Sequence, residues 1–212
     1  MAEQTLPEGE QKARAVRGMF DAIAPRYDLV NRVMTFGMDR GWRRKTVAAL
    51  GLPPGAVVLD LAAGTGDLSD EALRQRLTPI GVDLSFGMLA ATHSPAPRLQ
   101  GDITRLPVPA TSVDGALCGF ALRNVVSLDD LFAELARVLR PGGRIGLLEV
   151  DEPEHAVTRW GHHVYFHRVV PVIGGLLSDR DAYRYLPAST AYLPPRLDLL
   201  ASLGAAGFEH VE

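Results

Sequence analysis

The pattern of apolar and polar positions predicts helices in the first quarter of the chain. Through residues 16–52 the apolar side chains recur three or four positions apart, which is the spacing of one face of a helix. Pro25 and Gly37 interrupt this pattern, so we expect two or three short helices rather than one long one. Residues 1–15 are polar and contain no apolar run, and we expect them to form a mobile tail.

Short apolar runs then alternate with helical patterns through residues 53–150. Most of these runs are rich in β-branched residues and are bounded by glycine, proline or aspartate, which is typical of buried strands. The expected strands are 56–61, 79–83, 98–100, 113–120 and 144–150, and the clearest helices are 67–77 and 129–139. Strands that alternate with helices run parallel and are joined by right-handed crossovers. This region therefore predicts a doubly wound α/β domain with a mostly parallel sheet.

After residue 150 the alternation stops. We expect an aromatic-rich helix in 155–173, further helices in 179–189 and 197–203, and a strand that begins at 208–211. We interpret 151–195 as a helical insertion and 196–212 as a return to the core. A chain of 212 residues is enough for one domain with a well-buried core and too short for two, so we expect a single domain.

Composition and charge narrow the class of protein. Apolar residues make up 47% of the chain and charged residues 22%, as in ordinary globular domains. The formal net charge of −3 argues against nucleic acid as a partner, because nucleic-acid binding needs a concentrated basic face. Basic residues do cluster within 40–45. A solvated helix face is the simpler interpretation of this cluster, and a phosphate site is the alternative.

The cysteine content and the lack of long apolar runs bear on the compartment. Cys118 is the single cysteine, so the chain can form no intramolecular disulfide and no cysteine-rich metal site. The polar start does not resemble a signal peptide. No run approaches the roughly 20 apolar residues that cross a bilayer. We therefore expect a cytoplasmic protein, and contact with the inner face of a membrane stays open.

The strongest local signal is the run from Asp60 to Asp67, which directly follows the first expected strand and contains Gly64 and Gly66. Glycines at a strand-to-helix turn let the backbone approach a ligand closely, and the next helix presents free N–H groups. Asp83 ends the second expected strand, 19 positions after Gly64. This spacing suits a carboxylate that accepts hydrogen bonds from ribose hydroxyls, since such sheets bind ligands beyond the carboxyl ends of their strands.

The loop favours S-adenosylmethionine over a dinucleotide as the ligand. Ser69 stands where a dinucleotide-binding loop has glycine or alanine, and Asp67 would repel a pyrophosphate. S-adenosylmethionine has no phosphate and carries positive charge on its amino group and sulfonium, so acidic side chains near the loop are tolerable. The competing interpretation is that Asp60, Asp83 and Asp102 only cap helices and form turns, as aspartate commonly does.

Several motifs in order along the chain resemble the quinone C-methyltransferase family of menaquinone and ubiquinone synthesis. The matching segments are 20–28 with Asn31, 39–44, 59–67, 119–125, 137–143 with 148–149, and 181–189. The resemblance implies a Rossmann-like class I methyltransferase that transfers a methyl group from S-adenosylmethionine to a ring carbon of a lipid-tailed quinol, most directly demethylmenaquinol to menaquinol. It also implies that 16–52 lie over the active site, that 151–195 lie on the substrate side, and that the terminal strand pair of the fold is missing.

The residues that we assign to the cofactor lie in the glycine loop or at the ends of expected strands. They are Asp60, Gly64, Thr65, Gly66, Asp83, Asp102, Ile103 and Gly119. The resemblance implies that Asp83 holds the ribose and that Asp102, with the backbone of Ile103, contacts the adenine edge.

Methylation of carbon needs an electron-rich ring carbon held behind the methyl group, and a group that stabilises a phenolate would favour it. Arg123 and Asn124 follow the fourth expected strand. We hypothesise that both bind the quinol oxygens and that Arg123 organises a water that takes the proton. The alternative is that Arg123 pairs with Asp129 or Asp130 and that Asn124 forms a turn.

Other side chains are candidates for the substrate side. Tyr27, Asn31 and Tyr185 are expected to line the substrate pocket, although Tyr27 suits the core equally well. The histidines within 162–167 complete no known zinc motif, and we expect no metal. The aromatic residues of 160–170 are expected either to contact the isoprenoid tail or a membrane surface, or to pack in the core. The sequence leaves open whether the chain forms a homodimer.

A few substitutions set this chain apart from the usual motifs of the family. Ala63 and Ala121 stand where glycine is usual, Gly119 replaces a common serine, and 150–153 differ from the usual sequence at that point. These departures leave two alternatives open. One is methylation of oxygen or nitrogen on another small molecule, and the other is a paralogue that binds the cofactor without catalysis. A dinucleotide oxidoreductase fits least.

Overall fold

The computed structural model describes residues 9–150 and 189–211 and the single positions 155, 161, 165, 168, 170 and 185. This part of the chain contains a sheet of five parallel strands in the order β3-β2-β1-β4-β5. The strands are β1 (Val57–Leu61), β2 (Thr78–Asp83), β3 (Arg98–Gln100), β4 (Val113–Gly119) and β5 (Leu139–Leu148). The alternation of strands and helices confirms the predicted doubly wound α/β fold.

The central strands β1 and β4 are buried on both faces of the sheet. Along β1, Val58 packs with one layer of helices, whereas Leu59 and Leu61 pack with the other, as the alternation of side chains along a strand requires. The direction in which strands are added reverses at these two strands, because β2 and β3 lie beside β1 and β5 lies beside β4. The crevice beyond the carboxyl ends of such strands is the usual ligand site.

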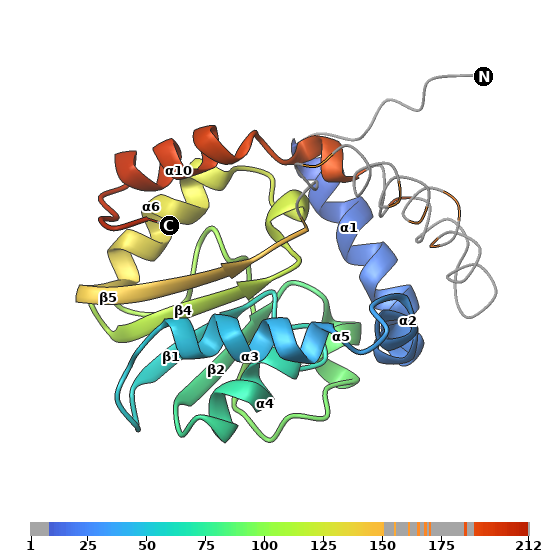
Figure 1. Cartoon of the computed structure of the whole chain (residues 1–212), viewed down its shortest axis with the longest axis horizontal. Helices are drawn as coiled ribbons and strands as arrows, with labels where there is room; N and C mark the ends of the chain where they lie inside the picture. The colour runs from blue at the N-terminus through green and yellow to red at the C-terminus, as the bar shows by residue number, and fades with distance from the viewer. Residues whose placement is uncertain are drawn as a thin grey trace.

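Helices cover both faces of the sheet (Figure 1). α3 (Asp39–Ala49) and α4 (Asp67–Arg74) lie on one face, and α6 (Leu128–Val138) and α10 (Arg196–Ala205) lie on the other. The apolar stripe of α6 is fully buried and consists of Leu131, Phe132, Leu135 and Val138. α6 begins after Ser127, whose hydroxyl accepts a hydrogen bond from the backbone N–H of Asp130.

The N-terminal helices lie at the end of the sheet toward which the strand arrows point (Figure 1). They are α1 (Gly9–Ile23), the 3₁₀ turn η1 (Ala24–Arg26) and α2 (Tyr27–Met34), and α5 (Phe86–Ala90) packs against α1. The helices are short and break at Pro25, as expected. The prediction of a mobile tail through residue 15 is wrong, because residues 9–15 belong to α1. α1 begins at Gly9, and distant groups anchor its first turns: Lys12 Nζ donates a 2.8 Å hydrogen bond to the Val125 carbonyl and lies 3.7 Å from the ring centroid of Tyr192.

The segment Pro141-Gly142-Gly143 does not precede β5, as expected, but lies inside it. Leu139 pairs with Val113 and Arg144 pairs with Gly115, so the residues between them form an irregularity in the ladder. A Cβ atom at Gly143 would lie 2.8 Å from the Arg140 carbonyl oxygen, which explains why this irregularity needs glycine. Helix α4 likewise ends at Arg74, earlier than the expected residue 77.

The segment after β5 is described only in part. The helices expected in 155–173 and 179–189 lie mostly outside the described residues, whereas α10 confirms the helix expected at 197–203. The strand expected at 208–211 is wrong, since Phe208 and Val211 pack against the core without pairing with a strand. Within the residues that the structure describes, no helix is both long and apolar enough to span a membrane.

Candidate active site at the carboxyl ends of the strands

The glycine loop between β1 and α4 turns tightly at the carboxyl end of a central strand. Ala62, Gly64 and Gly66 have positive φ angles of 51°, 57° and 99°. A Cβ atom at Gly66 would lie 2.6 Å from the Cβ atom of Ser94, so no larger residue fits there. A Cβ atom at Gly64 would meet no atom within 4 Å. The Gly64 side of the loop therefore faces open space, where a ligand can approach the backbone.

Asp83, at the end of β2, fixes this loop and the one that follows β2. One of its carboxylate oxygens accepts a 2.8 Å hydrogen bond from the Gly64 N–H, and the other accepts a 2.7 Å bond from the Ser85 N–H. Burial raises the pKa of the Asp83 carboxyl above its ordinary value. Each carboxylate oxygen has a second lone pair, so Asp83 can still accept hydrogen bonds from a ligand. The ribose-binding role of Asp83 stays a prediction.

Asp60 lies at the end of β1 and is only 1% exposed. Its Oδ2 accepts a 2.6 Å hydrogen bond from the Ser69 hydroxyl, and its carboxylate also interacts with the Ser69 N–H in the first turn of α4. Burial raises the pKa of the Asp60 carboxyl to about 7. These contacts agree with the capping interpretation of Asp60, which joins the strand to the helix that frames the loop.

Asp102 and Gly119 lie at the same edge of the sheet. Asp102 is exposed, and its Oδ1 accepts hydrogen bonds of 2.9 and 2.8 Å from the N–H and the hydroxyl of Thr104, which is the geometry of an aspartate turn. The Ile103 side chain is buried in the core. A Cβ atom at Gly119 would lie 2.8 Å from Leu68 Cδ1, so a serine at this position would require Leu68 to move. Contacts of these residues with a cofactor stay predictions.

Helices α2 and α3 rest directly on the glycine loop. The Thr65 hydroxyl donates a 2.5 Å hydrogen bond to Asp28 Oδ1 of α2. Arg43 of α3 lies 3.0 Å from Asp67 Oδ2 and also pairs with the buried carboxylate of Asp39. Asp28 was missed by the sequence analysis, because its partner Thr65 lies 37 positions away. These contacts make the inner faces of α2 and α3 part of the wall of the site.

Arg123 is 5% exposed and lies in the turn η2 (Leu122–Asn124) that follows β4. Its guanidinium forms an ion pair with Glu149 at the end of β5. The alternative pairing with Asp129 or Asp130 is wrong, because both are exposed in the first turn of α6. In the described part of the chain, Arg123 Nε and Glu149 Oε2 are buried without a hydrogen-bond partner. Glu149 was missed as a partner of Arg123, and its signal was a charged residue near the carboxyl end of an expected strand.

The expected substrate residues lie around this pair. The Tyr185 hydroxyl donates a 3.3 Å hydrogen bond to Asn124 Oδ1. Burial raises the pKa of Tyr27, and the positive charges of Arg43 and Arg123 oppose this rise, so Tyr27 lies within electrostatic range of Arg123. The Tyr27 hydroxyl also interacts with the Asn31 side chain. The structure thus places Tyr185 beside Asn124, whereas Tyr27 also packs against the core of the N-terminal helices, as the alternative interpretation expected. Contact of these residues with a substrate stays a prediction.

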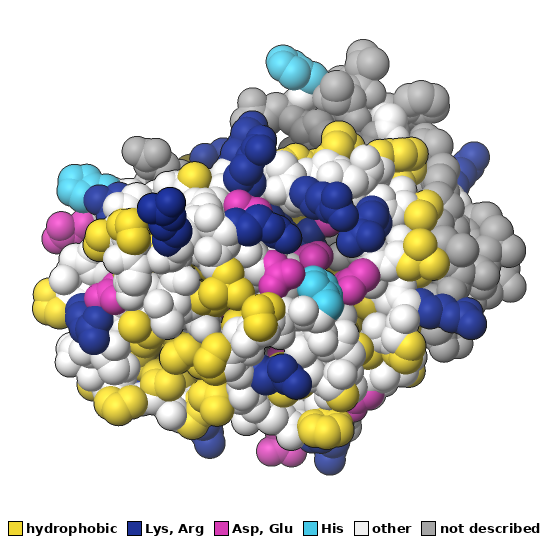
Figure 2. Space-filling model, turned by 90° about the horizontal axis from the view of Figure 1, so that it is seen from below, with side chains coloured by type: hydrophobic (Ala, Val, Ile, Leu, Met, Phe, Trp, Pro, Cys, Tyr) yellow, Lys and Arg dark blue, Asp and Glu magenta, His cyan; other side chains and the backbone are white. Residues whose placement is uncertain are grey.

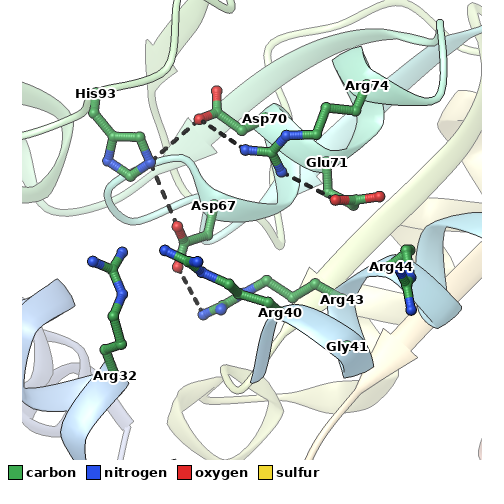
Figure 3. A pocket seen from close by; sticks show the side chains of 10 residues that line it. All are labelled: Arg32, Arg40, Gly41, Arg43, Arg44, Asp67, Asp70, Glu71, Arg74 and His93. Carbon is green, nitrogen blue, oxygen red and sulfur yellow. Dashed lines mark hydrogen bonds and ion pairs between the residues drawn. The ribbon is translucent and has the colours of Figure 1, made fainter. Parts of the chain in front are cut away.

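A charged groove of about 590 Å³ opens beside the glycine loop, between α3 and α4 (Figures 2 and 3). It is lined by five arginines, three carboxylates and His93, which lies 3.4 Å from Asp70 and 3.5 Å from Asp67. Neither Gly64 nor Asp83 lines it, so the groove adjoins the expected cofactor site without being that site. No three histidine, cysteine or carboxylate side chains of the described residues are placed to hold a metal ion. The histidines within 162–167 lie outside those residues.

Several named methyltransferases are similar in sequence to this chain along most of its length. The chain is 42% identical over 204 residues to "Ubiquinone/menaquinone biosynthesis C-methyltransferase UbiE" of Syntrophotalea carbinolica, with 92% of this chain and 86% of the relative covered. It is 40% identical over 220 residues to "Demethylmenaquinone methyltransferase" of Roseiflexus castenholzii, with 100% and 92% covered.

Solved structures agree with the fold. A SAM-dependent methyltransferase of Thermotoga maritima superposes with a TM-score of 0.62 at 21% identity, over 92% of this chain and 81% of that one. Phosphoethanolamine N-methyltransferase 2 of Haemonchus contortus, solved with S-adenosyl-L-methionine, has a TM-score of 0.59 at 18% identity, over 80% of this chain and 37% of that one. These likenesses confirm the Rossmann-like methyltransferase fold. Residues 8–212 match the ubiE/COQ5 methyltransferase family, and the chain belongs to it.

Proposed function

We propose that this enzyme uses S-adenosylmethionine to methylate a ring carbon of a polyprenylated quinol, converting demethylmenaquinol to menaquinol. The names of its relatives support this reaction class. The observation that carries the proposal is the buried pair of Arg123 and Glu149 beside the glycine loop, in which one donor and one acceptor lack partners. A hydroxyl group both donates and accepts, so a single quinol hydroxyl can satisfy both atoms.

The residues around the loop fit S-adenosylmethionine. The backbone at Gly64 is open to a ligand, and Asp83 beside it can accept further hydrogen bonds. A phosphate group beside the loop would be repelled by the Asp67 carboxylate, so the loop suits a ligand without phosphate better than a phosphorylated one. Bound S-adenosylmethionine supplies an electrophilic methyl group on a positively charged sulfur.

The protein's part in the reaction is to raise the electron density of the quinol ring. A quinol hydroxyl donates its hydrogen bond to Glu149 Oε2 and transfers its proton there, while the quinol oxygen accepts a hydrogen bond from the Arg123 Nε–H. The guanidinium then stabilises the phenolate in a pocket with little water, where such stabilisation is worth a few kcal/mol, roughly a hundredfold to a thousandfold in rate. The ring carbon loses its hydrogen as a proton once it is methylated, so the whole reaction releases one proton. Asn124 and Tyr185 orient the second quinol oxygen.

The experiment is to incubate the full chain with S-adenosylmethionine and chemically reduced demethylmenaquinone and to detect the product by mass spectrometry. We expect one added methyl group on the ring, with no product when the quinone is left oxidised. A sample that binds S-adenosylhomocysteine but methylates no ring carbon would contradict the proposal. The alternative reaction would then be transfer of the methyl group to an oxygen or nitrogen atom of another small molecule.

A further inference from the structure

Exposed apolar side chains gather at the corner formed by α2, α3 and the turn between them. In the described part of the chain ten large hydrophobic side chains are exposed, and five of them lie within the stretch 29–42. These five, which we call the apolar corner, are Leu29, Val33, Phe36, Met38 and Trp42. Phe36 is 74% exposed, Leu29 55% and Met38 53%. Monomeric proteins rarely expose such groups together, and a cluster of this kind marks an interaction surface.

The apolar corner lies beside the core, and two of its rings contact partly buried rings: the centroid of Phe36 lies 5.9 Å from that of Tyr165, and the centroid of Trp42 lies 6.3 Å from that of Phe120. α2 already buries one apolar face, on which Val30 and Met34 pack with the N-terminal helices. Leu29 and Val33, one helical turn apart, point to the other side. A helix at the surface of a globular protein normally carries polar residues on its outer face. The outer face of α2 departs from this pattern, as the surface of an interaction site does.

Basic side chains surround the apolar corner. Arg32, Arg40, Arg44 and Lys45 are exposed and belong to no ion pair found in the described part of the chain. The only acidic residue within 29–46 is Asp39, which is buried against Arg43. The corner is thus positively charged, although the whole chain has a net charge of −3.

The carboxylates nearest to this positive surface are already paired. They lie across the charged groove on α4, where Asp67 pairs with Arg43 and Glu71 pairs with Arg74 (Figure 3). Asp70 lies near both Arg74 and His93. Figure 2 shows basic side chains on the rim of the groove, with the acidic ones and a histidine between them. The unpaired charge that this face presents to a partner is therefore basic.

We propose that the α2–α3 corner docks on the surface of an anionic lipid bilayer. Phe36 and Met38 enter the interface between headgroups and acyl chains, while the arginines of the rim contact lipid phosphates. Apolar side chains flanked by unpaired basic ones are typical of interfacial membrane binding. Protein interfaces are also enriched in aromatic residues, methionine and arginine, so a protein partner is the competing occupant, and a vesicle-binding measurement separates the two. The inner faces of the same helices contact the glycine loop through Asp28 and Arg43, so docking here would bring the bilayer close to the site.

This proposal goes beyond the proposed function and can be tested without a quinol. The full chain is mixed with sucrose-loaded vesicles of phosphatidylcholine alone, or of phosphatidylcholine with phosphatidylglycerol, and the pelleted fraction is measured against lipid concentration and salt. We expect binding to the anionic vesicles that weakens as salt rises. The triple variant R32Q/R40Q/R44Q should bind about a hundredfold more weakly, at about fivefold for each arginine. F36N/M38Q should bind about tenfold more weakly.

The matched control is R196Q/L197Q. It removes one exposed arginine and one leucine that is 77% exposed from α10, which lies on the other side of the molecule from α2 (Figure 1). This control should bind vesicles as the unaltered chain does. Circular dichroism and the mass in solution by light scattering accompany each variant. The proposal is overturned if anionic vesicles do not pellet the chain, or if the corner variants bind like the control. It is also overturned if F36N/M38Q converts a dimer to a monomer, which would make the corner an interface between copies.

Discussion

Two pairs of buried polar residues lie at the same edge of the sheet. They differ in how completely other groups of the protein form hydrogen bonds with them. Asp83 accepts hydrogen bonds from two backbone N–H groups, and Asp60 is bonded to Ser69. By contrast, Arg123 and Glu149 each keep one buried atom without a partner in the described part of the chain. The predicted cofactor side of the site is therefore held in shape by the chain's own hydrogen bonds, whereas we expect a ligand to complete the predicted substrate side.

This difference has a physical reason. A loop that binds a cofactor with its backbone must hold that backbone in one conformation beforehand, or the ligand would have to supply the ordering energy. Groups that act on a substrate must instead keep hydrogen-bonding capacity for it, and a buried unpaired polar atom costs about 1–3 kcal/mol of stability. Such unpaired atoms are retained where function needs them.

The largest effect is expected from Glu149→Gln, which keeps the shape of the side chain but removes its ability to take the quinol proton. We expect kcat for quinol methylation to fall about a thousandfold, equivalent to about 4 kcal/mol. The dissociation constant of S-adenosylhomocysteine, measured by calorimetry, should change less than about threefold, since a difference that small is below 1 kcal/mol. Asp129→Asn, on the exposed start of α6, is the control and should leave both values unchanged. Equal losses of turnover and cofactor affinity would remove the distinction between the two sides.

The next effect concerns the cofactor side. In the unaltered chain each carboxylate oxygen of Asp83 accepts a hydrogen bond from a backbone N–H group. Asp83→Asn keeps only one of these oxygens, and its amide NH₂ would point at the other N–H, which cannot accept a hydrogen bond. We expect the affinity for S-adenosylhomocysteine to fall tenfold to a hundredfold, or about 1.4–2.7 kcal/mol, with kcat at saturating cofactor less affected. Asp129→Asn is again the comparison, because Asp129 is exposed at the start of α6 and has no role in the loop. If Asp129→Asn lowered the affinity as much, the backbone role of Asp83 would not explain its effect.

A third prediction uses the raised pKa of Asp60. Its folded-state pKa of about 7 lies above the ordinary 3.8, so between these values the folded chain holds a proton that the unfolded chain has lost. The free energy of unfolding therefore falls as pH rises through this window, by up to about 1.4 kcal/mol per pH unit. Asp60→Asn cannot titrate and should lose this slope, becoming more stable than the unaltered chain toward pH 7. Urea unfolding at several pH values measures the difference, and parallel profiles of the two chains would contradict the prediction.

The centre of the sheet could be predicted because β1 and β4 are largely apolar local runs. The segment 57–61 is buried between two helix layers and is apolar except for Asp60, which the sequence displays directly. The start of α1 could not be predicted in this way. Lys12 is ordered by Val125 and Tyr192, and the first of these lies 113 positions away. The local sequence of residues 9–15 is polar and therefore indicates a tail, whereas contacts with distant residues stabilise a helix there.

The site divides along the same line. Asp83 could be found because a residue at the end of a strand must lie at the sheet edge, whatever the rest of the chain does. The partner of Arg123 could not be found, because nearness in sequence favours Asp129 over Glu149. Arg123 pairs with Glu149 because β4 and β5 are neighbouring strands, and the two residues follow the carboxyl ends of these strands.

The smallest effect is expected where the cofactor side meets the helices above it. Thr65→Val replaces the hydroxyl that donates to Asp28 with a methyl group of similar size. Asp28 is only partly buried and also lies 3.4 Å from His93, so water can replace the lost donor and the free energy of unfolding should fall by only about 1 kcal/mol. Because the bond joins α2 to the loop, KM for the quinol should rise a fewfold while kcat stays near its original value. Thr104→Val, which removes a hydroxyl from the exposed Asp102 turn, should leave KM for the quinol unchanged. A fall in kcat for Thr65→Val as large as that for Glu149→Gln would mean that the loop takes part in the chemical step, and that the two sides of the site are not separate.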